Sequence, residues 1–198
     1  MSGDRQLRLM NALTHGNGLK RREEGRRRGN SLDLACKAYL LEEPMLALEQ
    51  QHFAFFRKLQ PVLDDLRSHF DRFECDRVVY NERDGYAGTI DILAYRGNAA
   101  IVIDLKTKYQ APSQSILADH WLQVIAYGNA LVSEGVDVFG VGLIISTTKS
   151  CELLTESDEV TIDRYLKQWG DRLNAFNYSS QALTEIDPSE HLAMEVLI

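Results

Sequence analysis

The stretch YAGTIDILAYRGNAAIVIDLKT, residues 86–107, has the apolar, β-branched composition of two buried strands, yet it also carries two aspartates and a lysine. Between the strands, Gly97 and Asn98 are typical of the centre of a two-residue hairpin turn. Such a turn sets the register of both strands. Counting back from it along each strand places Asp91 directly opposite Asp104.

The period-two alternation of strands then assigns these side chains to two faces. One face is expected to carry Thr89, Asp91 and Leu93 with Lys106, Asp104 and Val102, and the other, expected to be the core, carries Ile90, Ile92, Leu105 and Ile103. Facing carboxylates, with Cβ atoms about 4.5–5.5 Å apart, repel each other and require a neutralising partner. Either a divalent metal ion or the ammonium of Lys106 can supply it, and in the second case the site is only an ion-paired patch. Converging oxygen ligands suit Mg²⁺ or Mn²⁺ far better than zinc.

Helical periodicity lies on both sides of these strands. The expected elements are a helix after a cap at Asn30-Ser31, a helix over 45–70 with a break near Pro61, three antiparallel strands between 73 and 107, a helix ending at Gly135, a strand over 138–146 and a helix over 158–176. This pattern predicts an α/β fold in the order α-α-β-β-β-α-β-α. We expect one domain over residues 1–198, with residues 1–28 as a basic N-terminal segment.

Charge is distributed unevenly along the chain. The net charge of −7 argues against nucleic acid as a partner, but residues 20–28, KRREEGRRR, carry six basic and two acidic residues. Such a segment is either a solvated surface or an arm that contacts phosphates despite the acidic total. In the second case Arg26, Arg27 and Arg28 are the expected nucleic-acid-binding residues.

Composition disfavours several other classes of protein. No apolar run approaches the roughly 20 residues that a membrane span requires, and the N-terminal residues lack the apolar stretch of a signal peptide. Cys36, Cys75 and Cys151 form no CxxC pair, so we expect reduced cysteines without a zinc site. A cytoplasmic protein with no membrane contact is therefore expected.

Four short motifs carry a resemblance to a known family. They are, in chain order, RGNSLD (28–33), GTID (88–91), IDLKT (103–107) and QVIAY (123–127). This ordered set resembles the PD-(D/E)XK nuclease superfamily, and within it the RecB-type branch, which includes the nuclease domains of bacterial recombination helicases and the mitochondrial genome-maintenance exonuclease. The branch usually has histidine where this chain has Asp33. Glu74 matches an acidic residue that often opens the first core strand there.

The resemblance implies a restriction-endonuclease-like core, a mixed β-sheet in the order β-β-β-α-β flanked by helices, with residues 73–146 as the catalytic core. It also implies that Asp91, Asp104 and the main-chain carbonyl of Leu105 hold one or two Mg²⁺ or Mn²⁺ ions. Asp33, expected in the first turn of its helix, would complete the metal shell. No iron–sulfur cluster is expected, because the cysteines that ligate it in some relatives are missing.

The same resemblance assigns further roles. Lys106 would position the attacking water and help to deprotonate it, while Gln123 and Tyr127, four residues apart on a helix, would face the site or the substrate backbone. His120 on the same helix is expected in solvent. The implied activity is a Mg²⁺-dependent exonuclease acting on single-stranded DNA or DNA with free ends, in replication, recombination or repair. The alternatives are a structure- or site-specific endonuclease and a non-catalytic nucleic-acid-binding module; the oligomeric state stays open.

Overall fold

The computed structural model describes the backbone of residues 3–184 and the side chains of residues 20–178, so residues 1–2 and 185–198 of the expected domain lie outside the described part. The elements are α1 (Gly3–Leu40), a short 3-10 helix η1 (Gln50–His52), α2 (Phe53–His69), β1 (Arg72–Asn81), β2 (Tyr86–Arg96), β3 (Ala99–Thr107), α3 (Gln114–Ser133), β4 (Asp137–Ser146), β5 (Cys151–Glu156) and α4 (Glu159–Thr184). This order contains the expected β-β-β-α-β succession.

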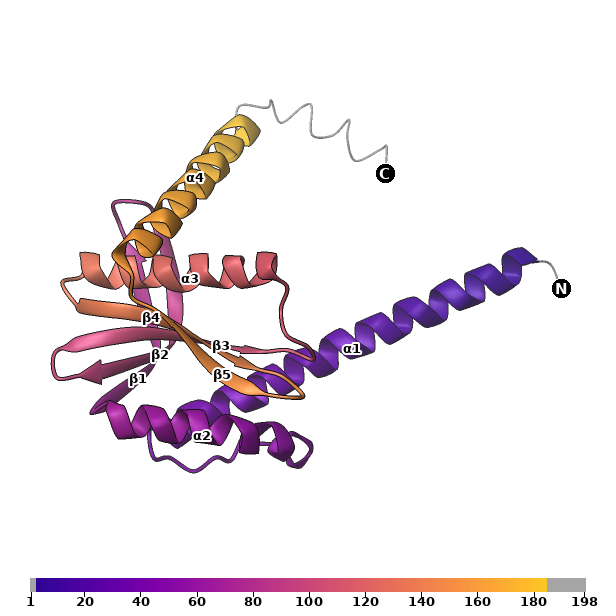
Figure 1. The fold of residues 1–198 in the computed structure, drawn as a ribbon. Helices are drawn as coiled ribbons and strands as arrows, with labels where there is room; N and C mark the ends of the chain where they lie inside the picture. The colour runs from indigo at the N-terminus through magenta and orange to yellow at the C-terminus, as the bar shows by residue number, and fades with distance from the viewer. Residues whose placement is uncertain (1–2, 185–198) are drawn as a thin grey trace.

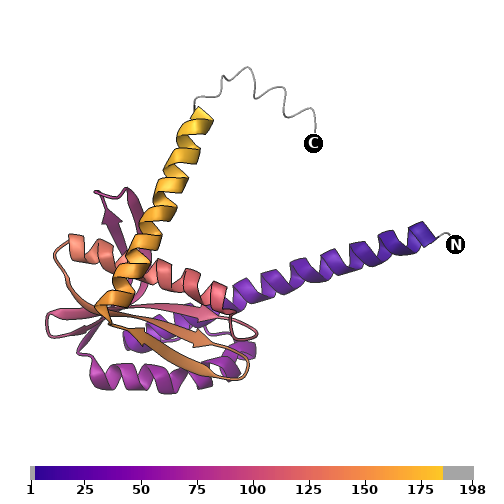
Figure 2. The ribbon, with the colours of Figure 1, turned by 45° about the horizontal axis from the view of Figure 1, so that its top comes forward.

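The described strands form one mixed sheet in the order β1-β2-β3-β4-β5. Strands β3 and β4 are parallel and are joined by the crossover helix α3, whereas the other neighbours are antiparallel. Helices α1 and α2 cover one face of the sheet, and α3 covers the other with α4 packed against it (Figure 1; Figure 2). The predicted fold class, a mixed sheet flanked by helices, is therefore confirmed.

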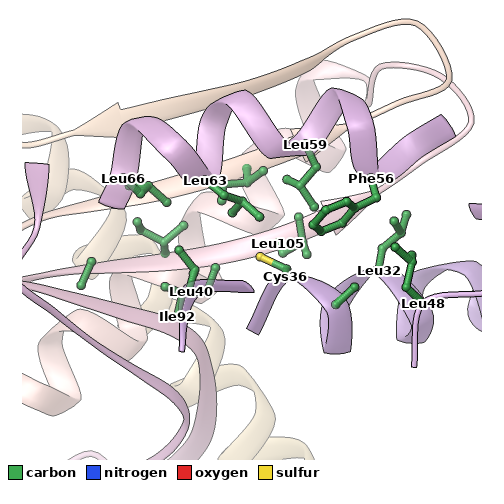
Figure 3. Close-up of a cluster of buried hydrophobic side chains, with 14 of the residues drawn as sticks. Leu32, Cys36, Leu40, Leu48, Phe56, Leu59, Leu63, Leu66, Ile92 and Leu105 are labelled. Carbon is green, nitrogen blue, oxygen red and sulfur yellow. The ribbon is translucent and has the colours of Figure 1, made fainter. Parts of the chain in front are cut away.

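Each face of the sheet has its own hydrophobic core. Figure 3 shows the core on the side of α1 and α2, where Leu32 and Cys36 meet Leu59 and Leu63 near Leu105. The core under α3 joins Leu93, Val102, Leu143 and Ile145 of the sheet to Val124, Ile125 and Leu131 of the helix. The expectation that only one face is core is wrong, because helices bury both faces of a sheet that contains a parallel pair.

The hairpin between β2 and β3 has the predicted register. Arg96 pairs with Ala99, and the pairing continues as far as Ile92 with Ile103. Gly97 has a φ of 60°, in the left-handed region that such a turn requires. The chemistry of a two-residue turn thus sets the alignment of the two strands that carry the aspartates.

The alternation of faces breaks where Asp76 of β1 lies across from Asp91 of β2. Asp76 has a φ of 55°, which is uncommon for a residue with a side chain, and the ladder lacks a pair at this position. Beyond the break Ile90 packs in the core under α3, whereas Ile92 packs in the core under α1 and α2. The predicted placement of Ile90 and Ile92 on one face is therefore wrong.

Helix α1 runs without interruption through Asn30 and Ser31, so the predicted cap there is wrong. The Ser31 hydroxyl instead fixes the loop that follows the helix: it donates to Ala47 O at 2.9 Å and accepts from Glu49 N at 3.1 Å. Asp33 consequently lies inside the helix and not in its first turn. The N-terminal part of α1 projects away from the sheet in both views (Figure 1; Figure 2). Neither α1 nor any other described helix is long and apolar enough to cross a membrane.

Two other elements differ from the predicted pattern. Pro61 lies within α2 and does not end it. The proline is exposed, so water can reach the Arg57 carbonyl that loses its helical partner. Strand β5 is missing from the prediction because its string CELLTE is short, charged and poor in β-branched residues.

Candidate active site

Strand β3 presents Asp104 and Lys106 on the face that α3 covers. Leu105, between them, points into the opposite core (Figure 3), and alternation along the strand turns its two neighbours the other way. The Lys106 ammonium lies 2.9 Å from each carboxylate oxygen of Asp104 and donates a hydrogen bond to Oδ1. Asp104 is only 4% exposed, so this ion pair lies at the inner end of the candidate site.

Helix α3 adds two of the predicted side chains to this pair. Lys106 Nζ donates to Gln123 Oε1 at 3.1 Å, and Gln123 Nε2 donates to the Tyr127 hydroxyl at 3.0 Å. Gln123 and Tyr127 are about one helical turn apart and therefore share the face turned toward the sheet. The structure thus brings Asp104, Lys106, Gln123 and Tyr127 together in one hydrogen-bonded chain.

Tyr127 depends on the glycine of the GTID string. A Cβ placed on Gly88 would lie 2.1 Å from Cε1 and 2.6 Å from Cζ of the Tyr127 ring. The ring therefore packs directly on the backbone of β2, where no other residue fits. The sequence alone offers no signal for this role of Gly88, because the contact depends on how α3 lies on the sheet.

Asp91 lies where β2 and β3 stop pairing. The ladder ends at Ile92 and Ile103, one pair before Asp91 would meet Asp104. Instead, the Leu105 N–H donates a hydrogen bond to Asp91 Oδ2 at 2.9 Å. The predicted register therefore leads to the right place, but Asp91 contacts β3 through its carboxylate and not through the main chain.

The surroundings of Asp104 disfavour its charge. Burial raises the pKa of Asp104 to about 6; Lys106 opposes the rise, and the Asp91 carboxylate adds to it. Asp104 Oδ2 is buried and accepts no hydrogen bond from the described residues, although the Lys106 ammonium lies 2.9 Å away. This oxygen therefore has an ion-pair contact but no directed hydrogen bond, and it can also accept a contact from a further cation.

Asp33 and Lys37 of α1 form a second ionic cluster beside the first. Lys37 Nζ donates to Asp33 Oδ2 at 2.7 Å and to Asp76 Oδ1 at 2.5 Å. Burial raises the pKa of Asp33; Lys37 opposes the rise, while the carboxylates of Asp91 and Asp76 add to it. Asp33 is therefore near the candidate site but already shares an ammonium with Asp76.

Asp76 is the acidic residue of β1 that sequence reasoning missed. Glu74, the residue singled out by the resemblance, forms ion pairs with Arg72 and Arg77. Arg77 in turn pairs with Glu134 beyond the end of α3. No sequence motif distinguishes Asp76 from Glu74. In the structure they differ because Asp76 has a left-handed backbone and contacts Lys37, whereas Glu74 pairs with arginines.

The three predicted phosphate-binding arginines have different environments. Arg26 and Arg27 are exposed, and Arg27 Nε donates to Glu49 at 2.8 Å. Arg28 is buried, with 4% of its surface exposed. Only Arg26 and Arg27 are placed for direct contact with a ligand at the surface.

His120 is not in solvent as expected. Its Nε2 atom is buried and has no hydrogen-bond partner among the described residues. Burial, together with the charges of Lys106 and Lys108, lowers the pKa of His120 to about 4. The imidazole is therefore neutral near pH 7.

The donors around Asp104 fit a hard divalent cation. The carboxylates of Asp33, Asp76, Asp91 and Asp104 interact electrostatically and outnumber the two ammonium groups of Lys37 and Lys106. Among the described side chains, no group of three or more His, Cys, Asp or Glu could hold a metal ion by itself. Mg²⁺ commonly binds proteins through one or two carboxylates and completes its shell with water and substrate phosphates.

Comparison with known proteins yields solved structures only. No family model and no curated protein matches the chain. A protein from Eubacterium rectale named “putative exonuclease” matches 73% of this chain and 57% of its own, with 12% identity and a TM-score of 0.49. The structure of a protein named SSO0001 matches 70% of this chain and 73% of its own, with 19% identity and a TM-score of 0.34. The chain thus spans little more than half the length of the first of these proteins.

Proposed function

We propose that this chain is a metal-dependent deoxyribonuclease that hydrolyses phosphodiester bonds, in line with its resemblance to PD-(D/E)XK nucleases. The observation that carries the proposal is the buried Asp104 carboxylate, whose two oxygens each lie 2.9 Å from the Lys106 ammonium and whose charge also interacts with that of Asp91. One ammonium does not balance two neighbouring carboxylates, so a further cation is favourable at this position.

In this proposal Asp91, Asp104 and the Leu105 carbonyl hold Mg²⁺ or Mn²⁺, and Asp33 joins them if it releases Lys37. A bound dication lowers the pKa of a water molecule and offsets the charge that develops on the scissile phosphate. The Leu105 N–H fixes the Asp91 carboxylate by donating to its Oδ2. The second Asp91 oxygen then remains available as a ligand.

Lys106 orients the attacking water. Its ammonium has three N–H donors, of which one is directed to Asp104 and one to Gln123. The third can bond to the water or to a phosphate oxygen. Gln123 holds Lys106 in this position, and its own amide is fixed by Tyr127, whose ring rests on Gly88.

We further propose that the enzyme acts from DNA ends. The exposed cations Arg26 and Arg27 can hold phosphates without regard to base sequence. Contacts of this kind favour an enzyme that follows a strand by its backbone over a site-specific endonuclease.

The proposal is tested by incubating the full chain with linear and covalently closed circular DNA, with Mg²⁺ or with EDTA. We expect Mg²⁺-dependent loss of the linear DNA and persistence of the circle. Cleavage of the circle would favour the endonuclease. Binding of DNA without cleavage of any linear substrate would favour the non-catalytic module and overturn the proposal. Glu152→Gln, on the exposed surface of β5, is the control for a lost carboxylate.

A further inference from the structure

Arg28 is a buried cation without an anionic partner in the described part of the chain. Its side chain is almost fully buried, and its Nε atom has no hydrogen-bond partner there. The neighbouring Arg27 instead points outward to Glu49. An unpaired buried charge is costly, so something other than an ion pair must favour this position.

Two aromatic rings supply that stabilisation. The Arg28 guanidinium carbon lies 5.0 Å from the ring centroid of Phe55 on α2 and 4.5 Å from that of Tyr109 after β3. Both distances are within the range of cation–π attraction, which strengthens when the cation is desolvated. One cluster therefore joins three separate segments of the chain: the Arg28 guanidinium of α1, the Phe55 ring of α2 and the Tyr109 ring of the loop after β3.

Tyr109 is the solvent-facing member of this cluster. The residue is 54% exposed although its ring contacts Arg28. Its main chain is held in place, because Tyr109 O accepts from Thr148 Oγ1 at 2.9 Å and Lys108 N donates to Ser146 O at 2.8 Å. An aromatic ring that is both anchored and exposed is suited to stacking against a planar ligand.

The position of Tyr109 connects it to the candidate active site. Tyr109 follows Lys106 by three residues, so their Cα atoms lie within roughly 10 Å of each other. Gly29, next to Arg28, approaches the same segment: a Cβ placed on it would lie 3.3 Å from Thr107 Oγ1. Lys108, between Tyr109 and the end of β3 in the sequence, adds a positive charge.

We propose that the Tyr109 ring, held from behind by Arg28, is a stacking platform for a nucleobase of the DNA strand bound at the Asp104 and Lys106 site. This inference rests on the proposed nuclease function and adds how the strand is gripped. Arg28 is a positioning residue in it and does not touch the DNA. Base–aromatic stacking tolerates any sequence, as a nuclease that digests from ends requires.

Binding of a short single-stranded oligonucleotide in EDTA tests the platform without cleavage. The oligonucleotide carries 2-aminopurine, whose fluorescence falls when the base stacks. Tyr109→Leu should bind roughly 5- to 100-fold more weakly and lose the quenching, whereas Tyr109→Trp should keep both. Tyr178→Ala on α4 removes another exposed tyrosine, 77% exposed, and should behave as wild type.

Two further experiments identify which nucleobase stacks on Tyr109 and test whether Arg28 holds the ring. Moving an abasic position along the oligonucleotide should find one position that weakens wild-type binding as much as Tyr109→Leu does, with no further loss when both changes are combined. Arg28→Met keeps an apolar side chain in the buried position and removes the charge. It should lower the quenching at saturating DNA, because the ring is no longer held.

Wild-type affinity and quenching in Tyr109→Leu would overturn the platform. If the wild-type chain cleaves DNA but no abasic position weakens its binding, the platform is overturned and the nuclease proposal stands. Base-dependent binding without metal-dependent cleavage would leave the platform standing and overturn the nuclease. Failure of the wild-type chain to bind the oligonucleotide would overturn the platform, and the cleavage assay with Mg²⁺ would decide the nuclease proposal separately.

Discussion

At the scale of single residues, Asp104 is the group whose ionisation depends most directly on the candidate site. Burial places its pKa at about 6, well above the usual value for aspartate. Metal-free protein therefore holds a proton on Asp104 more tightly when folded than when unfolded. The tighter proton binding adds to the free energy of unfolding. This contribution has its full value below the pKa of aspartate in the unfolded chain, about 3.9, and is lost as the pH rises through about 6.

We accordingly predict that Asp104→Asn changes how stability depends on pH. In EDTA, the melting temperature of wild type relative to the variant should fall between about pH 4 and pH 6, because the asparagine has no proton to lose. His120, whose lowered pKa acts in the opposite direction, is present in both proteins and largely cancels. Thermal melts in half-unit steps of pH measure the difference, and a constant difference would show that Asp104 does not titrate in this range.

Gly88 provides a second test at this scale. Gly88→Ala should destabilise the protein by about 1–3 kcal/mol and reduce cleavage, because the new methyl group would displace the Tyr127 ring. Gly170→Ala in α4, where nothing lies within 4 Å of the new Cβ, is the matched control and should be neutral or slightly stabilising. Urea unfolding and DNA cleavage measure both variants. Equal behaviour of the two would refute the packing role.

At the scale of elements, the turn and strand patterns predict the central hairpin correctly because its alignment depends on two adjacent residues, Gly97 and Asn98. Features that depend on contacts between distant segments escape prediction. The left-handed backbone of Asp76, the contact of Gly88 with Tyr127 and the burial of Arg28 all belong to this kind. The candidate chain from Asp104 to Tyr127 could be predicted because the motif resemblance supplies the long-range information that local patterns lack.

Helix α1 brings Asp33 near the site. Substitutions can show whether Asp33 serves as a metal ligand or only as a partner of Lys37. Asp33→Asn should reduce Mg²⁺-dependent cleavage strongly if Asp33 completes the metal shell. Asp76→Asn removes the other partner of Lys37 and should change the melting temperature more than the rate. Rates and melts of both variants measure this contrast. Near-normal turnover by folded Asp33→Asn protein would remove Asp33 from the metal shell.

At the scale of the whole molecule, an acidic chain must still attract a polyanion. The net charge of −7 coexists with the basic residues of α1, so the attraction is local to that helix. The carboxylates near Asp104 would repel phosphates without a dication. Binding of metal and binding of DNA are therefore expected to reinforce each other.

We predict that the double substitution Arg26→Gln and Arg27→Gln flattens the salt dependence of DNA binding. Each lost phosphate contact should reduce the slope of log affinity against log salt by about 0.7 for single-stranded DNA. The control is Arg83→Gln with Arg164→Gln, which changes two exposed arginines outside α1. Fluorescence anisotropy over a range of salt concentrations measures the slopes. An unchanged slope would show that Arg26 and Arg27 do not contact phosphates and are ordinary solvated residues.

The most direct test of the nuclease proposal is single-turnover cleavage of end-labelled linear DNA by Lys106→Met, with metal affinity measured by calorimetry on the same preparation. Because Lys106 orients the water and is not a ligand, we predict a rate about 10²- to 10⁴-fold lower, with metal and DNA binding largely retained. Lys167→Met, on the exposed surface of α4, should cleave as wild type. Cleavage by Lys106→Met at the wild-type rate would contradict the account.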